Sequence, residues 1–175
     1  MHRSVWHGGR AYFGEFSEDA IRSGEGDSLG WGFYFAENRK GGEYFAKYAN
    51  FRDGAGYLYE AQLELPDDRV LPLGSSYCQL DAHLRSRVSR VFSGSEMSLG
   101  FHSAYRILRD ELGDKVASVT LRGVGIRALT AYEDTDPGHG ITYLVIDKTC
   151  IALTRIFKFS NDPYEWQLLP IPPAT

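Results

Sequence analysis

The spacing of the apolar residues changes twice along this chain of 175 residues. Before residue 66 and after residue 125, short segments alternate apolar and polar side chains or form brief apolar runs, which is typical of strands. Between them, apolar residues recur every three or four positions, as on one face of a helix. Helices inserted between two strand-rich parts favour an α+β fold with a mixed or antiparallel sheet. The connecting segments are short and the composition does not change, so we expect a single domain over residues 1–175.

The individual elements follow from the same patterns. The strand pattern predicts strands at residues 4–7, 33–35, 57–65, 126–132, 143–146 and 151–159. Helical spacing predicts helices over residues 38–50, 77–91, 105–112 and 116–121. Ser17 is placed to cap a short helix over residues 18–22. The final segment, PIPPAT, cannot continue a sheet because of its prolines.

Composition and charge exclude several classes of protein. Apolar residues make up 43% of the chain, too many for a disordered protein, and no apolar run reaches the roughly 18 residues that span a bilayer. A net charge of −4 argues against coating nucleic acid or anionic lipid through bulk charge. Cys78 and Cys150 stand far apart, which excludes a disulfide scaffold or zinc ribbon and fits a reducing compartment. The first residues, MHRSVWHGG, lack the apolar part of a secretory signal, so we expect a cytoplasmic protein with no membrane partner.

Common cofactor motifs find no support in the chain. The five histidines have no metal-ligand spacing, and we expect no metal. Three glycines stand in residues 24–30, but their spacing matches neither of the usual phosphate-binding patterns. Glu25 and Asp27 would also repel a phosphate. We therefore interpret this segment as a connector.

A histidine and a dense aromatic segment form a candidate binding site. In VWHGG, His7 is followed by two glycines, which would place an imidazole beside a backbone that a flat ligand can approach closely. In WGFYFAENRKGGEYFAKYA, ring faces for stacking are offered by Tyr34, Tyr44, Phe45 and Tyr48. The same residues also fit a strand-end histidine and ordinary core aromatics. The residues alone leave both interpretations open.

Four motifs, in this order, resemble the ADP-ribosyltransferase superfamily: WHGG, GEGDSLGWGFYFAEN, YFAKYA on a helix, and GYLYEAQL. The chain is most similar to the histidine–tyrosine–acid branch, which includes diphtheria-like toxins and poly(ADP-ribose) polymerases. Within it, the chain resembles the small transferase domains of phage and bacterial polyvalent proteins. The stretch from VASVTLRGVGIRALTAYED to GITYLVIDKTCIAL is similar to the closing strands of that group. The resemblance covers about residues 5–158 and implies the family's fold, with split mixed or antiparallel sheets and helices inserted in the middle of the chain.

The resemblance implies a role toward NAD+ for each matched residue. His7 matches the histidine that hydrogen-bonds the nicotinamide-side ribose. Gly8 matches the glycine whose backbone pairs with the nicotinamide carboxamide, and Tyr34 matches the tyrosine that stacks on the nicotinamide ring. A second aromatic from the following helix closes the other face of the ring in this family. The chain offers three residues for that position, Tyr44, Phe45 and Tyr48.

The acidic residue departs from the family pattern. Thr142 stands where many relatives have a glutamate, immediately before a motif like YLVID. Some small phage-type relatives take the carboxylate from the end of the preceding strand, which points to Glu133 as the catalytic acid, with Asp134 and Asp136 as substitutes. A turn containing Asp136 would also explain these acids without any catalysis, because Asp, Pro and Gly build turns. Both interpretations of Glu133 stay open.

The function implied by the resemblance is mono-ADP-ribosylation. The enzyme would cleave the nicotinamide–ribose bond of NAD+ and transfer ADP-ribose to a macromolecule, a protein rather than a nucleic acid, as a phage or bacterial toxin or effector. One carboxylate would stabilise the oxocarbenium character of the sugar. Two alternatives remain. A catalytically silent module of this fold that binds a protein partner is favoured by Thr142, and a tRNA 2′-phosphotransferase-like activity would need site arginines, of which only Arg10 and Arg22 lie near the motifs.

Overall fold

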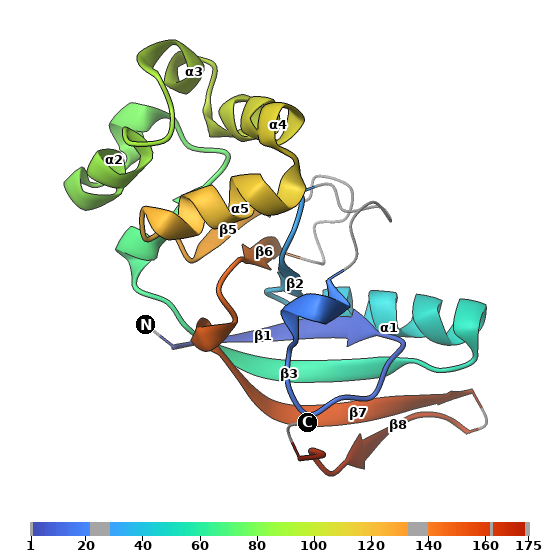
Figure 1. Ribbon diagram of the computed structural model, residues 1–175. Coiled ribbons are helices and arrows are strands. Elements are labelled where there is room, and N and C mark those ends of the chain that lie inside the picture. The colour runs from blue at the N-terminus through green and yellow to red at the C-terminus, as the bar shows by residue number, and fades with distance from the viewer. Residues whose placement is uncertain (1, 22–28, 133–139, 162, 174–175) are drawn as a thin grey trace.

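The computed structural model describes residues 2–21, 29–132, 140–161 and 163–173. Within these ranges, eight strands form one open sheet in the order β4-β5-β6-β2-β1-β3-β7-β8 (Figure 1). Only β4 and β5 run parallel; the other neighbours are antiparallel. The strands are β1 His2–Gly9, β2 Phe33–Ala36, β3 Tyr57–Glu64, β4 Val70–Pro72, β5 Ala128–Tyr132, β6 Ile141–Val145, β7 Ile151–Asn161 and β8 Tyr164–Leu169. The α-helices are α1 Arg39–Asp53, α2 Ala82–Val88, α3 Gly94–Ser98, α4 Phe101–Leu112 and α5 Asp114–Gly123.

This architecture confirms the expected α+β class, with a mixed sheet and helices inserted in the middle of the chain. Helices α2 to α5 all lie between β4 and β5 in sequence, and Figure 1 shows them gathered at one end of the molecule, away from β7 and β8. The structure corrects the expected split of the sheet. Trp6 of β1 and Ala36 of β2 form a registered pair, which joins all the strands into one sheet. An unpaired edge would leave backbone N–H and C=O groups without partners, which favours this joining.

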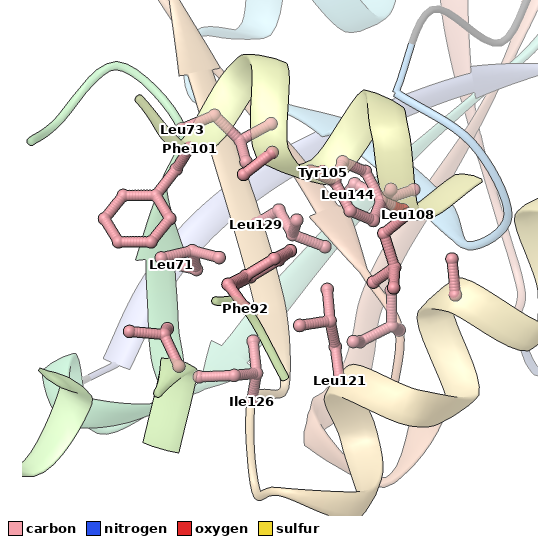
Figure 2. Close-up of a cluster of buried hydrophobic side chains, with 14 of the residues drawn as sticks. Leu71, Leu73, Phe92, Phe101, Tyr105, Leu108, Leu121, Ile126, Leu129 and Leu144 are labelled. Atoms are coloured by element: carbon pink, nitrogen blue, oxygen red, sulfur yellow. The ribbon is translucent and has the colours of Figure 1, made fainter. Parts of the chain in front are cut away.

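Helices α2 to α5 cover one face of the sheet at β4, β5 and β6. Figure 2 shows leucines of these strands, Leu71, Leu129 and Leu144, facing apolar side chains from the helical section. The helical partners include Phe101 and Leu121, both fully buried. Each such side chain contributes about 1.5–3 kcal/mol when it leaves water. The helical periodicity of the middle section therefore reflects this interface.

A second apolar cluster covers the opposite face of the sheet. Side chains alternate along a strand, so residues adjacent to Leu71, Leu129 and Leu144 point to this face. Those in the cluster are Val70, Ala128, Tyr143 and Val145. It extends from β4 to β7 and also contains Phe16, from the segment after β1. Its buried members are Val5, Phe16, Phe33, Phe35, Tyr59, Ala61, Leu63, Leu65, Val70, Ala128, Tyr143, Val145 and Ile156.

Helix α1 packs directly on β1 and β3 through glycine. A Cβ atom on Gly42 would stand 2.7 Å from the Cβ of Trp6 and 2.8 Å from Cδ1 of Leu58, so no side chain fits there. Glycine lowers helix propensity, but here it lets the helix approach the sheet. The helix runs to Asp53, three residues beyond the expected end, and stops at Gly54, whose φ of 76° suits a left-handed cap.

The predicted elements differ from the structure in several places. In place of the expected helix over residues 77–91, the structure has a 3-10 turn followed by α2. The Asp81 carboxylate accepts hydrogen bonds from the backbone N–H groups of His83 and Leu84, which starts a new helix there. Ser17 precedes a 3-10 turn, Glu18–Ala20, and makes no capping bond. Strands β4 and β8 and helix α3 were not expected; β4 and α3 are short, and β8 lies just before the proline-rich tail. No helix in the described ranges is long and apolar enough to cross a membrane.

Candidate functional site

The candidate site lies where β1 meets β2. The Nδ1 atom of His7 lies 2.7 Å from the carbonyl oxygen of Tyr34, although 27 positions separate the two residues in sequence. A carbonyl oxygen only accepts hydrogen bonds, so in the neutral imidazole Nδ1–H donates and Nε2 keeps its lone pair. The registered backbone pairing of β1 with β2 is confined to Trp6 and Ala36. The His7 side chain thus provides the bond to β2 next to this single pair.

Aromatic rings surround the imidazole of His7. Its centroid lies 5.4 Å from the ring of Phe16, 5.8 Å from Phe35 and 5.9 Å from Tyr59. Burial lowers the pKa of His7 below its ordinary value, and the bond to the Tyr34 carbonyl opposes only part of this shift. His7 is therefore neutral at pH 7, and its Nε2 atom is a hydrogen-bond acceptor. A Cβ atom on Gly9 would stand 3.3 Å from this Nε2, so glycine at that position keeps the nitrogen uncrowded.

The structure distinguishes the three aromatic candidates on α1. A Cβ atom on Gly8 would stand 2.8 Å from the Cβ of Phe45, so Phe45 is the aromatic residue next to the WHGG motif. The ring of Tyr44 packs edge-on against Phe45 at 5.3 Å. Tyr48 stands one turn further along the helix, with the Arg52 guanidinium 5.9 Å from its ring centroid. The sequence does not show which of the three residues lies beside Gly8, because this depends on how α1 packs on β1.

Tyr34 is fixed by the chain that leads into β2. Its hydroxyl donates to the carbonyl oxygen of Gly30 at 2.8 Å and accepts from the backbone N–H of Leu29 at 3.1 Å. The partly buried ring packs against the cluster beneath α2 to α5. The backbone of Tyr34 thus contacts His7, and its ring is held in a defined orientation.

The structure describes Thr142 but not the three proposed acids. Glu133, Asp134 and Asp136 lie outside the described residues. Thr142 is buried on β6, with Ala36 of β2 as its neighbour on one side and Ala131 of β5 on the other. Its hydroxyl carries no negative charge, so Thr142 cannot replace the family glutamate.

Sequence reasoning missed Glu37, an exposed carboxylate at this end of the sheet. Its backbone N–H donates to the Ile141 carbonyl at 2.8 Å, and its Oε2 accepts from the Ile141 N–H at 3.1 Å. Both bonds tie the end of β2 to the start of β6, one residue from the Ala36–Thr142 pair. The only signal in the sequence was its place directly after the strand FYFA.

Two arginines bear on the phosphotransferase alternative. Arg10 lies 3.6 Å from the Asp53 carboxylate, and Arg22 is outside the described residues. Arg109 of α4 is a further arginine that sequence reasoning did not place here; a Cβ on Gly30 would stand 2.9 Å from its Nε. Arg109 is bonded to Asp114 at 2.7 Å. Both described arginines thus already have a carboxylate partner, which disfavours a phosphate site built on them.

One cavity adjoins the aromatic rings around His7, because Phe16 belongs to both. A cavity of about 260 Å³ is lined by Gly14, Glu15, Phe16, Lys148, Thr149, Ile151 and Leu153, none of which is a predicted site residue. Across the part of the chain that the structure describes, no group of three His, Cys, Asp or Glu side chains could hold a metal ion. Comparison of the chain with protein-family models, curated proteins and solved structures gives no match.

Proposed function

We propose that this protein has the ADP-ribosyltransferase fold and is an NAD+-dependent mono-ADP-ribosyltransferase that acts on a macromolecule. The observation that carries the proposal is the 2.7 Å contact between His7 Nδ1 and the Tyr34 carbonyl. It joins two of the four motifs on which the family resemblance depends. It also leaves the acceptor nitrogen of a neutral histidine available for a ribose hydroxyl.

The remaining residues have complementary roles in this proposal. The backbone of Gly8 pairs with the nicotinamide carboxamide, and the rings of Tyr34 and Phe45 hold the nicotinamide ring by stacking. The close contact of Gly8 with α1 supports Phe45 for this role over Tyr44 and Tyr48. NAD+ is the substrate, and no metal takes part in the proposed reaction.

The chemistry needs one carboxylate. The bond between ribose C1′ and the nicotinamide nitrogen breaks, and nicotinamide leaves as a neutral molecule with the bonding electron pair. The sugar gains oxocarbenium character, which the Glu133 carboxylate stabilises. A nucleophilic atom of the acceptor forms the new bond to C1′ and gives its proton to the same carboxylate. We propose that Glu37 is a positioning residue, because its carboxylate binds the start of β6.

The test is nicotinamide release from NAD+, measured by chromatography with and without host-cell lysate. We expect the unmodified protein to release nicotinamide and Glu133→Gln to lose about 100-fold or more in rate. Glu37→Gln keeps a hydrogen-bonding oxygen for the Ile141 N–H, so it should rescue activity relative to Glu37→Ala if Glu37 acts by positioning. Full activity of Glu133→Gln would move the acid to Asp134 or Asp136. Absence of release by the folded protein under every condition would overturn the proposal.

A silent binding module of the same fold is the second candidate. The observation in its favour is Thr142, a buried neutral residue beside the β1–β2 junction. Such a module would release no nicotinamide at any protein concentration. The same assay therefore separates the two candidates.

A further inference from the structure

The side of α1 that faces away from the sheet carries exposed aromatic rings. Tyr44, Tyr48 and Phe51 are 55%, 54% and 89% exposed. They stand at positions i, i+4 and i+7, which places them on one face of the helix. Together with Lys40 and Arg52, which are also exposed, these residues form what we call the outer α1 face.

Helix α1 has an excess of basic residues in a chain that is acidic as a whole. Helix α1 has four cationic residues and two acidic ones, whereas the net charge of the chain is −4. Both acids of the helix are already paired with cations. Glu43 lies 2.8 Å from Arg39 and 3.9 Å from Lys47, and Asp53 lies 3.2 Å from Arg52. Arg39, Lys47 and Arg52 take part in these pairs, so the positive charge of the outer α1 face comes mainly from Lys40.

We propose that the outer α1 face binds single-stranded nucleic acid. Exposed rings stack on unpaired bases, and neighbouring cations contact the phosphates. From Tyr44 to Phe51 the helix rises by about 10 Å, so the rings follow one another along a line that a short strand can track. A duplex would not offer its base faces to these rings. The net charge of the whole chain argues against coating nucleic acid through bulk charge, but the structure gathers basic and aromatic residues on this one helix.

The outer α1 face adjoins the candidate transferase site. Phe45 lies on the flank of the same helix, next to Gly8, and its ring contacts that of Tyr44. A strand on the outer α1 face therefore lies beside Phe45, one of the residues assigned to NAD+. Its role as the acceptor of ADP-ribose rests on the proposed function, whereas its binding does not.

Binding is measured by fluorescence anisotropy with labelled oligo-dT, oligo-U and a duplex of equal length, without NAD+. We expect the unmodified protein to bind one or both single strands more tightly than the duplex, and the affinity to fall as salt is raised. Phe51→Ala and Tyr48→Ala should each weaken binding by at least about fivefold. Lys40→Gln should reduce the dependence on salt. The two single-stranded probes distinguish DNA from RNA as the ligand.

Two matched variants serve as controls. Leu99→Ala removes an apolar side chain that is 60% exposed at the end of α3. Lys158→Gln removes an exposed lysine of β7. The rings of its neighbours Phe157 and Phe159 contact cations of α1. Because side chains alternate along a strand, Lys158 lies on the opposite face of the sheet from α1. Both should bind like the unmodified protein.

Three outcomes would overturn the inference: no binding of either single strand at low salt, equal binding of the duplex, or unchanged binding by Phe51→Ala and Tyr48→Ala. The last two would indicate bulk electrostatic attraction. Nicotinamide release is measured separately, so failure of binding and failure of the transferase proposal remain distinct. If the protein both binds the strand and releases nicotinamide, transfer of labelled ADP-ribose from NAD+ to the strand supports the strand as the acceptor. Absence of such transfer rejects the strand as the acceptor.

Discussion

The backbone carbonyl of Gly42 occupies the space that a side chain on Gly8 would need. A Cβ atom on Gly8 would stand 2.2 Å from this oxygen and 2.4 Å from the backbone nitrogen of Ala46. Helix α1 therefore rests directly on the end of β1. This contact brings Phe45 next to Gly8.

Replacement of Gly8 by alanine should destabilise the fold. The clashing atoms belong to the backbone of α1, so the helix itself must shift, and overpacking of this kind costs about 1–3 kcal/mol. Urea unfolding followed by circular dichroism measures the loss. Gly74→Ala is the matched control, because a Cβ there meets nothing within 4 Å. Equal stability of the two variants would contradict the close contact.

The stability of the protein should fall in acid partly because of His7. Burial lowers the pKa of His7 in the folded state, whereas in the unfolded chain it lies near the ordinary value of about 6.5. Below that pH the unfolded chain binds a proton that the folded protein does not, so stability rises with pH through this window and is lost as the pH falls. Urea unfolding at a series of pH values from about 7.5 to 5.5 tests this expectation.

The contribution of His7 to this pH dependence is read from a comparison of two variants. His7→Gln should show a shallower loss of stability on acidification than the unmodified protein. His83→Gln is the control, since His83 is exposed, and it should keep the full slope. Parallel pH profiles for the unmodified protein and His7→Gln would contradict the assignment.

Ser118 should contribute to stability through a buried hydrogen bond. Its hydroxyl is fully buried on α5 and donates to the Trp31 carbonyl at 2.7 Å, across 87 positions of sequence. Ser118→Ala leaves that carbonyl without this donor, which should cost about 1–3 kcal/mol. Ser98→Ala removes an exposed hydroxyl that bonds the Ser95 carbonyl at 2.6 Å and should change stability little. Thermal unfolding of both variants decides the point.

Truncation of Phe45 should raise the KM for NAD+ more than truncation of an exposed apolar residue elsewhere. Phe45→Ala removes the ring beside Gly8, and we expect the KM for nicotinamide release to rise about tenfold, in line with the loss of one aromatic contact of about 1.4 kcal/mol. Leu168→Ala, on β8, removes a side chain that is 61% exposed and should leave KM unchanged. An unchanged KM for Phe45→Ala would assign the second stacking ring to Tyr44 or Tyr48.

Sequence patterns predicted the elements with strong periodicity. The strand over residues 57–65 corresponds to β3, and the expected strand at residues 33–35 corresponds to β2. The pattern failed at residues 77–91 because Asp81 caps a new helix inside a continuous apolar spacing. It also missed β4, whose three residues pair only with β5. That pairing joins residues 70–72 to residues 128–130, and local patterns carry no information on such partners.

In the candidate site too, some features were predictable from the sequence and others depend on tertiary packing. The residue types alone predict that a histidine followed by two glycines ends one strand and that aromatic residues fill the next strand and helix. Local chemistry suffices for this, because glycine permits close approach and aromatic residues supply apolar area. Three relations were not predictable in this way: His7 bonds the Tyr34 backbone, Phe45 stands beside Gly8, and Tyr48 and Phe51 face outward. These relations depend on how α1 packs on β1 and how β1 meets β2, and such contacts between distant segments arise only when the whole sheet assembles.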